Sequence, residues 1–298
     1  MVIEVLKNYG FSEKKIQYLL NLYPICDMKE ETIIRNINDS YQFCKSIGLS
    51  DAAFVKANST SNPMFTRPIS SIENKYSDIK KLGFKDETVS KIIKMCPSIL
   101  GYSIETIKGK INDFISIGFD RDTVLKIIKD FPSLITFNID TITSKINDFI
   151  KMGYSKSDIL YMLKMKPQIM SYSMNSIMDK YNAAKELGYS DEQVLFISKN
   201  YPCMYSVSSN ILKEKIEILR MYGFEYTIFN DPSSLMQSAL LTFARINFFK
   251  DNGITIDESN WIRLFTTSDR FKKYYGFNND ELISLYEEKW ELFNGRVI

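Results

Sequence analysis

One pattern of 35 residues occurs four times in succession between Gly83 and Tyr222. Each copy opens with a glycine and an aromatic residue, and a proline follows fourteen residues after the glycine. The opening pairs are Gly83-Phe84, Gly118-Phe119, Gly153-Tyr154 and Gly188-Tyr189, and the prolines are Pro97, Pro132, Pro167 and Pro202. A tandem repeat of this length buries its apolar face by stacking on its neighbours. The sequence therefore predicts an all-α helical-repeat solenoid.

Each copy contains two segments with a helical pattern, which we call helix A and helix B. Helix A follows the aromatic residue, carries apolar residues at helical spacing such as Val89 and Ile92, and ends at the proline. Helix B has apolar residues four and then three positions apart, as in Ile107, Ile111 and Phe114. Residues suited to N-caps precede both helices: Asp120, Ser155 and Ser190 before helix A, and Ser103, Asn138, Ser173 and Ser208 before helix B.

The pattern changes toward both ends of the chain. The copy that opens at Gly10 is longer, and the copy that opens at Gly48 has a Ser/Asn-rich stretch at residues 58–62, where we expect helix A to fray. The copy that opens at Gly223 is shorter, and we expect its apolar helix at residues 235–249. Because a stacked array needs covered ends, we expect about seven repeats in residues 1–253 and a helical C-terminal cap in residues 254–298.

The composition removes most of the usual enzymatic chemistry. The 298 residues contain no histidine, which excludes histidine-based acid–base catalysis, Ser-His and Cys-His nucleophile pairs, and most zinc sites. We also find no Gly-rich phosphate loop, and we expect neither an enzyme nor a cofactor. The cysteines Cys26, Cys44, Cys96 and Cys203 lack a paired short spacing, so we expect free thiols in a reducing intracellular compartment. No apolar run is long enough for a membrane span, and we expect a monomer without membrane contact.

A lysine recurs at one position of helix B in five copies, at the edge of the apolar stripe. One interpretation is a boundary residue whose long stem covers apolar surface while its ammonium reaches water. The other is a row of phosphate contacts along a bound duplex. This helix B lysine row consists of Lys75, Lys110, Lys145, Lys180 and Lys215.

Six further cations toward the C-terminal end are candidates for contact with phosphate or guanine, although for any single one we favour an ordinary solvated face. They are Arg220, Arg245, Arg263, Arg270, Lys272 and Lys273. The aromatic residues at repeat starts, such as Phe119 and Tyr154, could stack on bases, but we favour packing between repeats.

The repeat resembles that of the mitochondrial transcription termination factor (mTERF) family, most clearly in residues 97–103 (PSILGYS) and 212–219 (LKEKIEIL). Residues 261–265 (WIRLF) and 268–271 (SDRF) are also similar to the C-terminal region of that family. The resemblance implies a left-handed superhelix of two-helix repeats, each with a short 3₁₀ turn. It also implies binding to double-stranded DNA or RNA, in transcription termination or RNA processing, in a mitochondrion or plastid. No transit peptide is visible in residues 1–10.

The net charge argues for a lower affinity for nucleic acid than the family resemblance implies. It is only +2, whereas nucleic-acid binders usually carry a clear basic excess. Residues 251–298 hold six Lys and Arg against nine Asp and Glu. A solenoid can still segregate positive charge onto one face. Two classes therefore remain, a nucleic-acid-binding repeat protein and, as the alternative, a protein-interaction solenoid that does not bind nucleic acid.

Overall fold

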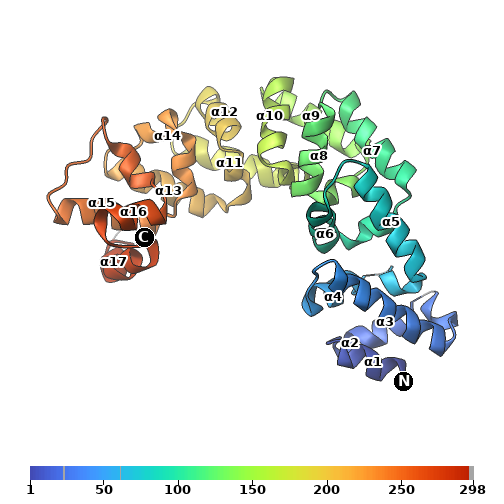
Figure 1. Ribbon diagram of the computed structural model, residues 1–298. Helices are drawn as coiled ribbons and strands as arrows, with labels where there is room; N and C mark the ends of the chain where they lie inside the picture. Colours follow the sequence, from blue (N-terminus) through green and yellow to red (C-terminus); the bar gives the residue numbers. More distant parts are fainter. Residues whose placement is uncertain (23, 61, 295–298) are drawn as a thin grey trace. The chain divides into compact units, whose positions relative to one another are not determined.

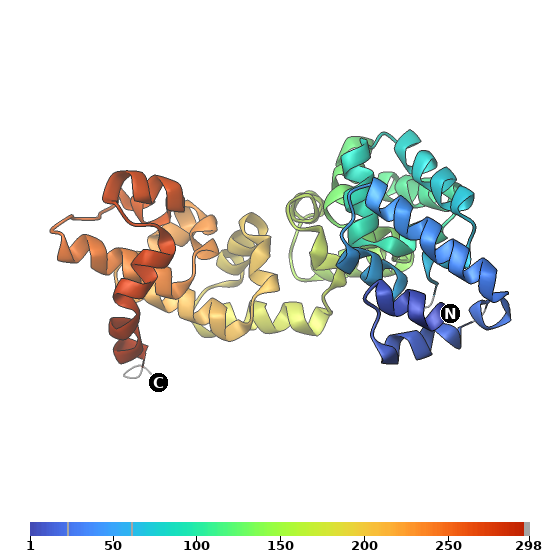
Figure 2. The ribbon, with the colours of Figure 1, turned by 60° about the horizontal axis from the view of Figure 1, so that its bottom comes forward.

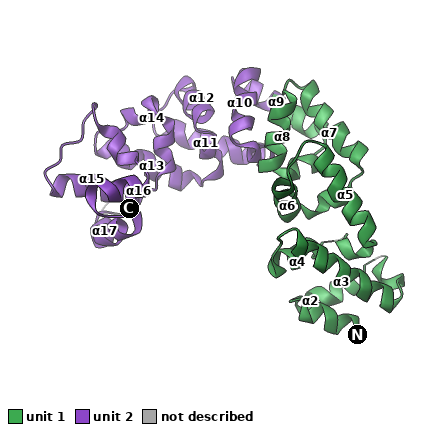
Figure 3. Cartoon of the chain, viewed as in Figure 1, with its two compact units in different colours: residues 1–146 green, residues 147–298 purple. Residues whose placement is uncertain are grey.

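The computed structural model describes residues 1–22, 24–60 and 62–294, and within these ranges the chain contains α-helices and short 3₁₀ helices but no strand. The predicted all-α helical-repeat fold is confirmed. The chain divides into two compact units, Met1–Ile146 and Asn147–Ile298, which are described separately (Figure 3). The boundary between them falls within α9 (Ile139–Lys151).

In unit 1, helices of one kind pack on helices of the same kind (Figure 1). The A helices α4, α6 and α8 pack successively, and so do the B helices α3, α5 and α7, with α1 against α3. The helices are α1 (Val2–Asn8), α2 (Glu13–Leu20), α3 (Glu30–Ser46), α4 (Asp51–Asn58), α5 (Ile69–Lys81), α6 (Asp86–Met95), α7 (Ile104–Ser116) and α8 (Arg121–Asp130). The 3₁₀ helices are η1 (Ile25–Asp27), η2 (Met64–Thr66), η3 (Pro97–Gly101) and η4 (Pro132–Thr136).

Unit 2 repeats the same arrangement, with α10, α12 and α14 in one row and α11, α13 and α15 in the other. Its helices are α10 (Lys156–Met165), α11 (Met174–Glu186), α12 (Asp191–Asn200), α13 (Ser209–Met221), α14 (Tyr226–Asn230), α15 (Ala239–Asp251), α16 (Ser268–Tyr275) and α17 (Asn279–Asn294). The 3₁₀ helices are η5 (Pro167–Ser171), η6 (Pro202–Ser206), η7 (Pro232–Met236) and η8 (Trp261–Phe265).

Local chemistry sets the start and the end of each helix. The side chains of Asp120, Ser155 and Ser190 accept hydrogen bonds from first-turn amides of α8, α10 and α12, as the sequence predicts. Ser103, Ser173 and Ser208 do the same for α7, α11 and α13. The residue before Pro97, Pro132, Pro167 or Pro202 lies outside the α region, with φ between −130° and −144° and ψ between 70° and 75°, because proline disfavours α geometry in the residue before it. The proline then begins the 3₁₀ helix.

Each glycine that opens a repeat has a positive φ, at the end of a B helix. At Gly153, where φ is +106°, a Cβ atom would also lie 3.0 Å from Cδ1 of Leu195 in α12. Glycine is required there both for the left-handed backbone and for the close approach of the next A helix.

Two boundaries differ from the sequence-based expectations. The apolar helix expected from residue 235 begins at Ala239, because Pro232 starts a 3₁₀ helix first and Ser238 caps α15 by accepting a hydrogen bond from the amide of Leu241. In the second copy, α4 ends at Asn58, two residues earlier in the repeat than α6 does, but Asn58 itself is held in place. Its buried amide group donates to the carbonyl of Phe54 and accepts from the amide of Met64. Position 61 of that stretch lies outside the described residues.

The end of unit 2 is built on α15. Helix α17 packs against α15 in both views (Figures 1 and 2), and their contact centres on Phe243 and Trp290. The two rings lie 5.2 Å apart in an edge-to-face arrangement. The division into repeats up to residue 253 and a cap from residue 254 stays a prediction, with which this packing of α17 is compatible.

Candidate nucleic-acid interface

The helix B lysines of unit 1 bind the backbone of the following repeat. Nζ of Lys75 in α5 donates to the carbonyl oxygen of Tyr102 at 2.6 Å, and Nζ of Lys110 in α7 donates to that of Phe137 at 2.9 Å. Tyr102 and Phe137 are the equivalent residues that end η3 and η4. Each lysine therefore joins a B helix to the 3₁₀ helix of the next repeat.

The remaining members of this row vary. Nζ of Lys215 in α13 donates to the carbonyl oxygen of Leu235 at 2.7 Å, and burial lowers the pKa of this lysine. Nζ of Lys180 in α11 donates to the hydroxyl of Ser176, one turn earlier, at 2.7 Å. Lys145 in α9 is half-buried.

These contacts favour a structural role for the helix B lysine row. The residues Lys75, Lys110 and Lys215 are half-buried, as expected for lysines whose stems cover apolar surface. An ammonium has three N–H donors, so one carbonyl does not saturate it. Lys75, Lys110 and Lys215 are therefore ties between repeats first, and contact of the row with phosphate stays a prediction.

Arg245 lies in the interior of unit 2, although the sequence suggested a surface cation. Its guanidinium donates to the carbonyl oxygens of Leu264 at 2.7 Å and Thr266 at 2.8 Å, and to Oδ1 of Asn279 at 2.7 Å. It also lies over the ring of Phe271, 4.5 Å from the centroid. The side chain is fully buried, which lowers its pKa to about 10. This position gives the guanidinium no access to a phosphate.

Arg220 forms a polar cluster at the end of α13. Its guanidinium donates to both carboxylate oxygens of Glu225, at 2.7 Å and 3.1 Å, and to the carbonyl of Leu187 at 2.8 Å. The hydroxyl of Tyr189 donates to the same carboxylate at 2.8 Å. These hydrogen bonds, chiefly that from Arg220, hold the pKa of Glu225 below its ordinary value. The charge of Arg220 is thus locally neutralised.

The four remaining candidates lie in or near α16. Arg263, Arg270 and Lys273 are exposed, and Lys272 forms an ion pair with Glu281 at 3.3 Å. These four side chains belong to unit 2, whereas Lys75, Lys110 and Lys145 of the helix B lysine row belong to unit 1.

A recurrent polar triad explains part of the low net charge. The triad first occurs where the second repeat begins. There Oδ1 of Asp51 accepts hydrogen bonds from Tyr41 at 2.8 Å and from Lys45 at 3.2 Å, which hold the pKa of Asp51 below its ordinary value. The same triad occurs twice more, as Tyr76, Lys80 and Asp86, and as Tyr181, Lys185 and Asp191. These lysines sit beside carboxylates at junctions between helices B and A.

A second set of periodic lysines lies on the exposed side of the A helices of unit 1, and the sequence reasoning above missed it. The set shares the 35-residue period, which is the signal that could have revealed it. Because α4, α6 and α8 pack successively, these side chains lie on neighbouring helices. We call it the helix A lysine row: Lys56, Lys91, Lys94, Lys126 and Lys129, all exposed.

The environment of this row is less neutralised than that of the triads. Lys91 forms an ion pair with Asp130 at 3.4 Å, whereas Lys94, Lys126 and Lys129 have no ion-pair partner within the described ranges. Lys94 and Lys129 lie in the last turns of α6 and α8, where a cation also interacts favourably with the helix dipole. A structural preference therefore explains the presence of these two lysines, and their exposure leaves them accessible to a ligand.

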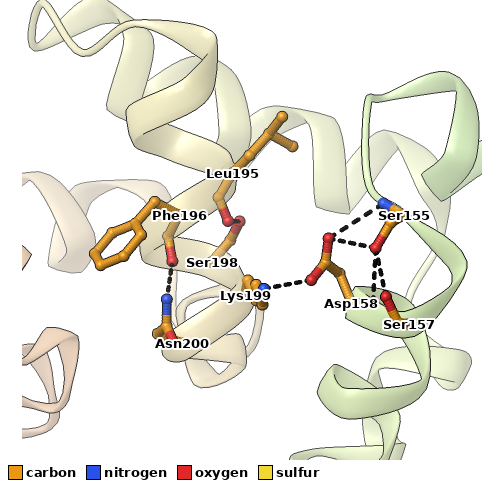
Figure 4. A network of polar contacts seen from close by, with 8 residues as sticks. All are labelled: Ser155, Ser157, Asp158, Leu195, Phe196, Ser198, Lys199 and Asn200. Carbon is orange, nitrogen blue, oxygen red and sulfur yellow. Dashed lines mark hydrogen bonds and ion pairs between the residues drawn. The ribbon is translucent and has the colours of Figure 1, made fainter.

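In unit 2 the equivalent face carries a polar network between α10 and α12 (Figure 4). The ammonium of Lys199 pairs with the carboxylate of Asp158, which also accepts hydrogen bonds from the hydroxyl and the backbone amide of Ser155. Lys199, then Ser155, holds the pKa of Asp158 below its ordinary value. This network joins the start of one A helix to the end of the next.

The aromatic residues at repeat starts pack inside the units, as we favoured. Phe119 is 5% exposed and Tyr154 is 3% exposed. The hydroxyl of Tyr154 contacts Ser198 and lies 2.6 Å from the hydroxyl of Tyr205. Burial raises the pKa of Tyr154 far above the usual range for tyrosine. These positions are not available to stack on bases.

The repeating pairs of α-helices, each followed by a 3₁₀ helix, define an α-helical repeat protein of the solenoid class. The family model for mTERF matches residues 1–223, so the chain belongs to the mTERF family. No curated protein matches the chain. Within the described ranges, no helix is both long and apolar enough to span a membrane, and no group of three or more Cys, Asp or Glu residues is placed to hold a metal ion.

Proposed function

We propose that this protein binds the sugar–phosphate backbone of nucleic acid through the helix A lysine row of unit 1, and that it acts in transcription termination or RNA processing in an organelle. Membership of the mTERF family supports the class of ligand. The observation that carries the proposal is the run of exposed lysines on the successively packed helices α4, α6 and α8.

The geometry of this row suits a sequence-independent contact. Packed helices lie about 8–10 Å apart, whereas duplex DNA presents one charge per ~1.7 Å of its axis. This spacing is permissive: a lysine on each successive helix can meet a phosphate in many registers of the duplex, without selecting one sequence. Lysine is a point charge on a flexible stem and contacts phosphate without reading base edges.

The test is a variant with Lys91, Lys94, Lys126 and Lys129 changed to Gln. Binding to random-sequence duplexes is measured at several salt concentrations for the parent and the variant. Each lost phosphate contact flattens the logarithmic salt dependence by up to ~0.9 on DNA, so we expect weaker binding to every sequence and a flatter slope. Folding should change little, because all four side chains are exposed and surface ion pairs such as Lys91–Asp130 contribute little to stability.

The matched control is a variant with Lys75, Lys110 and Lys215 changed to Gln. We expect its main defect to be lower stability, because these lysines tie neighbouring repeats together. A flatter salt dependence of binding in this control, together with an unchanged salt dependence in the helix A variant, would assign the contact with nucleic acid to the helix B lysine row.

The protein-interaction alternative is favoured by one observation, the local pairing of many lysines with carboxylates at a net charge of only +2. It predicts that the parent protein binds neither duplex DNA nor duplex RNA at ~0.15 M salt, near the physiological ionic strength. That result would overturn the proposal.

A further inference from the structure

Two exposed aromatic residues replace lysines of the repeat in unit 2. Tyr161 in α10 and Phe196 in α12 stand at the position that Lys56, Lys91 and Lys126 occupy in α4, α6 and α8. Tyr161 is 44% exposed and Phe196 is 43% exposed. The fold leaves both rings partly exposed, so burial in the core of unit 2 does not explain the change from lysine to an aromatic residue at this position in two successive copies.

The rings are held by rigid elements. Helix α12 packs against both α10 and α14. One side of Phe196 stacks on Phe229, with ring centroids 6.5 Å apart and an interplanar angle of 27°. Figure 4 shows the side chain of Phe196 projecting from α12 away from the ion pair of Lys199 and Asp158. The ring is therefore oriented by another ring, and polar contacts do not cover it.

Each aromatic residue has a lysine one turn later on the same helix. Lys164 follows Tyr161, and Lys199 follows Phe196, and residues three apart are neighbours on a helix surface. Lys164 is exposed and has no ion-pair partner in the part of the chain that the structure describes. Lys199 is neutralised by Asp158. The surface thus combines two accessible rings with at least one available cation.

We infer that Tyr161 and Phe196 form a stacking platform for unpaired bases, so that the nucleic acid this protein binds includes a single-stranded segment. This inference rests on the proposed function. Bases within a duplex have both faces covered by their neighbours, whereas unpaired bases stack on exposed aromatic side chains. The exposed Lys164 beside Tyr161 suits the adjoining phosphate, since single-strand sites combine stacking rings with positive charge. A purely apolar partner would leave Lys164 without a counter-charge.

The test compares a fluorescently labelled single strand with a blunt duplex of the same sequence. The protein is the full chain with Tyr161 and Phe196 changed to Ala. Loss of a stacking ring weakens single-strand binding by about 5-fold to 150-fold for each base. We expect that loss for the single strand, with unchanged duplex affinity and an unchanged salt slope. Changing Ile211 and Met221 to Ala is the control, because both are exposed apolar residues of unit 2 on the B helix α13.

A conservative variant keeps the inference falsifiable if the alanine variant folds poorly. Phe196→Trp should retain single-strand affinity, and its added indole emission should be quenched when a base stacks on it. Absence of quenching, with affinity retained, would overturn the inference.

The failures of the two proposals are distinguishable. No binding of the parent to any nucleic acid overturns the proposed function and this inference together. Binding by the parent, with single-strand affinity unchanged in the Tyr161 and Phe196 alanine variant, overturns this inference alone. An equal loss for single strand and duplex in that variant would also overturn it, because a stacking platform discriminates between the two.

Discussion

The ammonium nitrogen of Lys110 lies 2.9 Å from the carbonyl oxygen of Phe137 and donates a hydrogen bond to it. Phe137 ends η4 in the next repeat, so this bond joins α7 to a neighbouring repeat. Lys75 makes the equivalent bond to Tyr102. The recurrence of lysine at this position therefore has a structural cause that does not depend on any ligand.

Changing Lys110 to Met should lower the free energy of unfolding by about 1–2 kcal/mol, because a charge-assisted hydrogen bond is lost and the carbonyl of Phe137 loses its partner. Urea denaturation measures this effect. Lys108→Met is the control, since Lys108 is exposed on the same helix and should change stability little. Equal effects of the two substitutions would contradict the structural role of Lys110.

Alanine substitutions at Gly153 and Gly188 distinguish the cost of a left-handed backbone from the cost of a steric conflict. Both have a positive φ, +106° and +94°, but a Cβ atom would meet Leu195 at 3.0 Å only at Gly153. We expect Gly188→Ala to destabilise the protein by about 1–2 kcal/mol through the left-handed backbone alone. Gly153→Ala should cost more, because Leu195 must also shift. Equal unfolding midpoints for the two variants would show that Leu195 adapts freely.

Arg245→Met should release the region that follows α15. The substitution leaves the carbonyl oxygens of Leu264 and Thr266 without the donor that now satisfies them. We expect a loss of about 2–6 kcal/mol, because each of the two carbonyls left without a donor costs about 1–3 kcal/mol, together with faster proteolysis after residue 253. Arg263→Met, at an exposed arginine of the same region, is the control and should leave the cleavage pattern unchanged.

Glu225→Gln should reduce stability at neutral pH but not in acid. The folded-state pKa of Glu225 is lowered, chiefly by Arg220, so its contribution is present above the ordinary glutamate pKa and is lost as pH falls through the folded value. Both side chains are about one third exposed, which limits the effect to about 0.5–1 kcal/mol.

Urea denaturation at pH 7 and at pH 3 checks this prediction. The difference between the parent and the Glu225→Gln variant should be smaller at the lower pH. Glu287→Gln, at an exposed glutamate, is the control. A difference that grows on acidification would have the wrong sign for a lowered pKa.

The sequence by itself determined the local parts of this protein. The proline after α6, the cap at Ser155 and the glycine at position 153 act over a few residues, so the repeat pattern was enough to predict two helices per copy and their ends. The shorter copy misled the prediction because Pro232 begins a 3₁₀ helix that no apolar pattern reveals.

Only the tertiary structure decided which cations are accessible. Lys110 and Lys94 both recur with the same period, yet one is tied to a carbonyl of the next repeat and the other is exposed. Lys215 finds its carbonyl at Leu235, which lies within η7, whereas Lys110 uses Phe137, which ends η4. Arg245, which reads as a surface cation in the sequence, is enclosed by a region that follows it by 19 to 34 residues. Long lysine and arginine side chains bind the carbonyl oxygens that the stacking of repeats brings within their reach. The sequence of one repeat does not show which carbonyl oxygens these are.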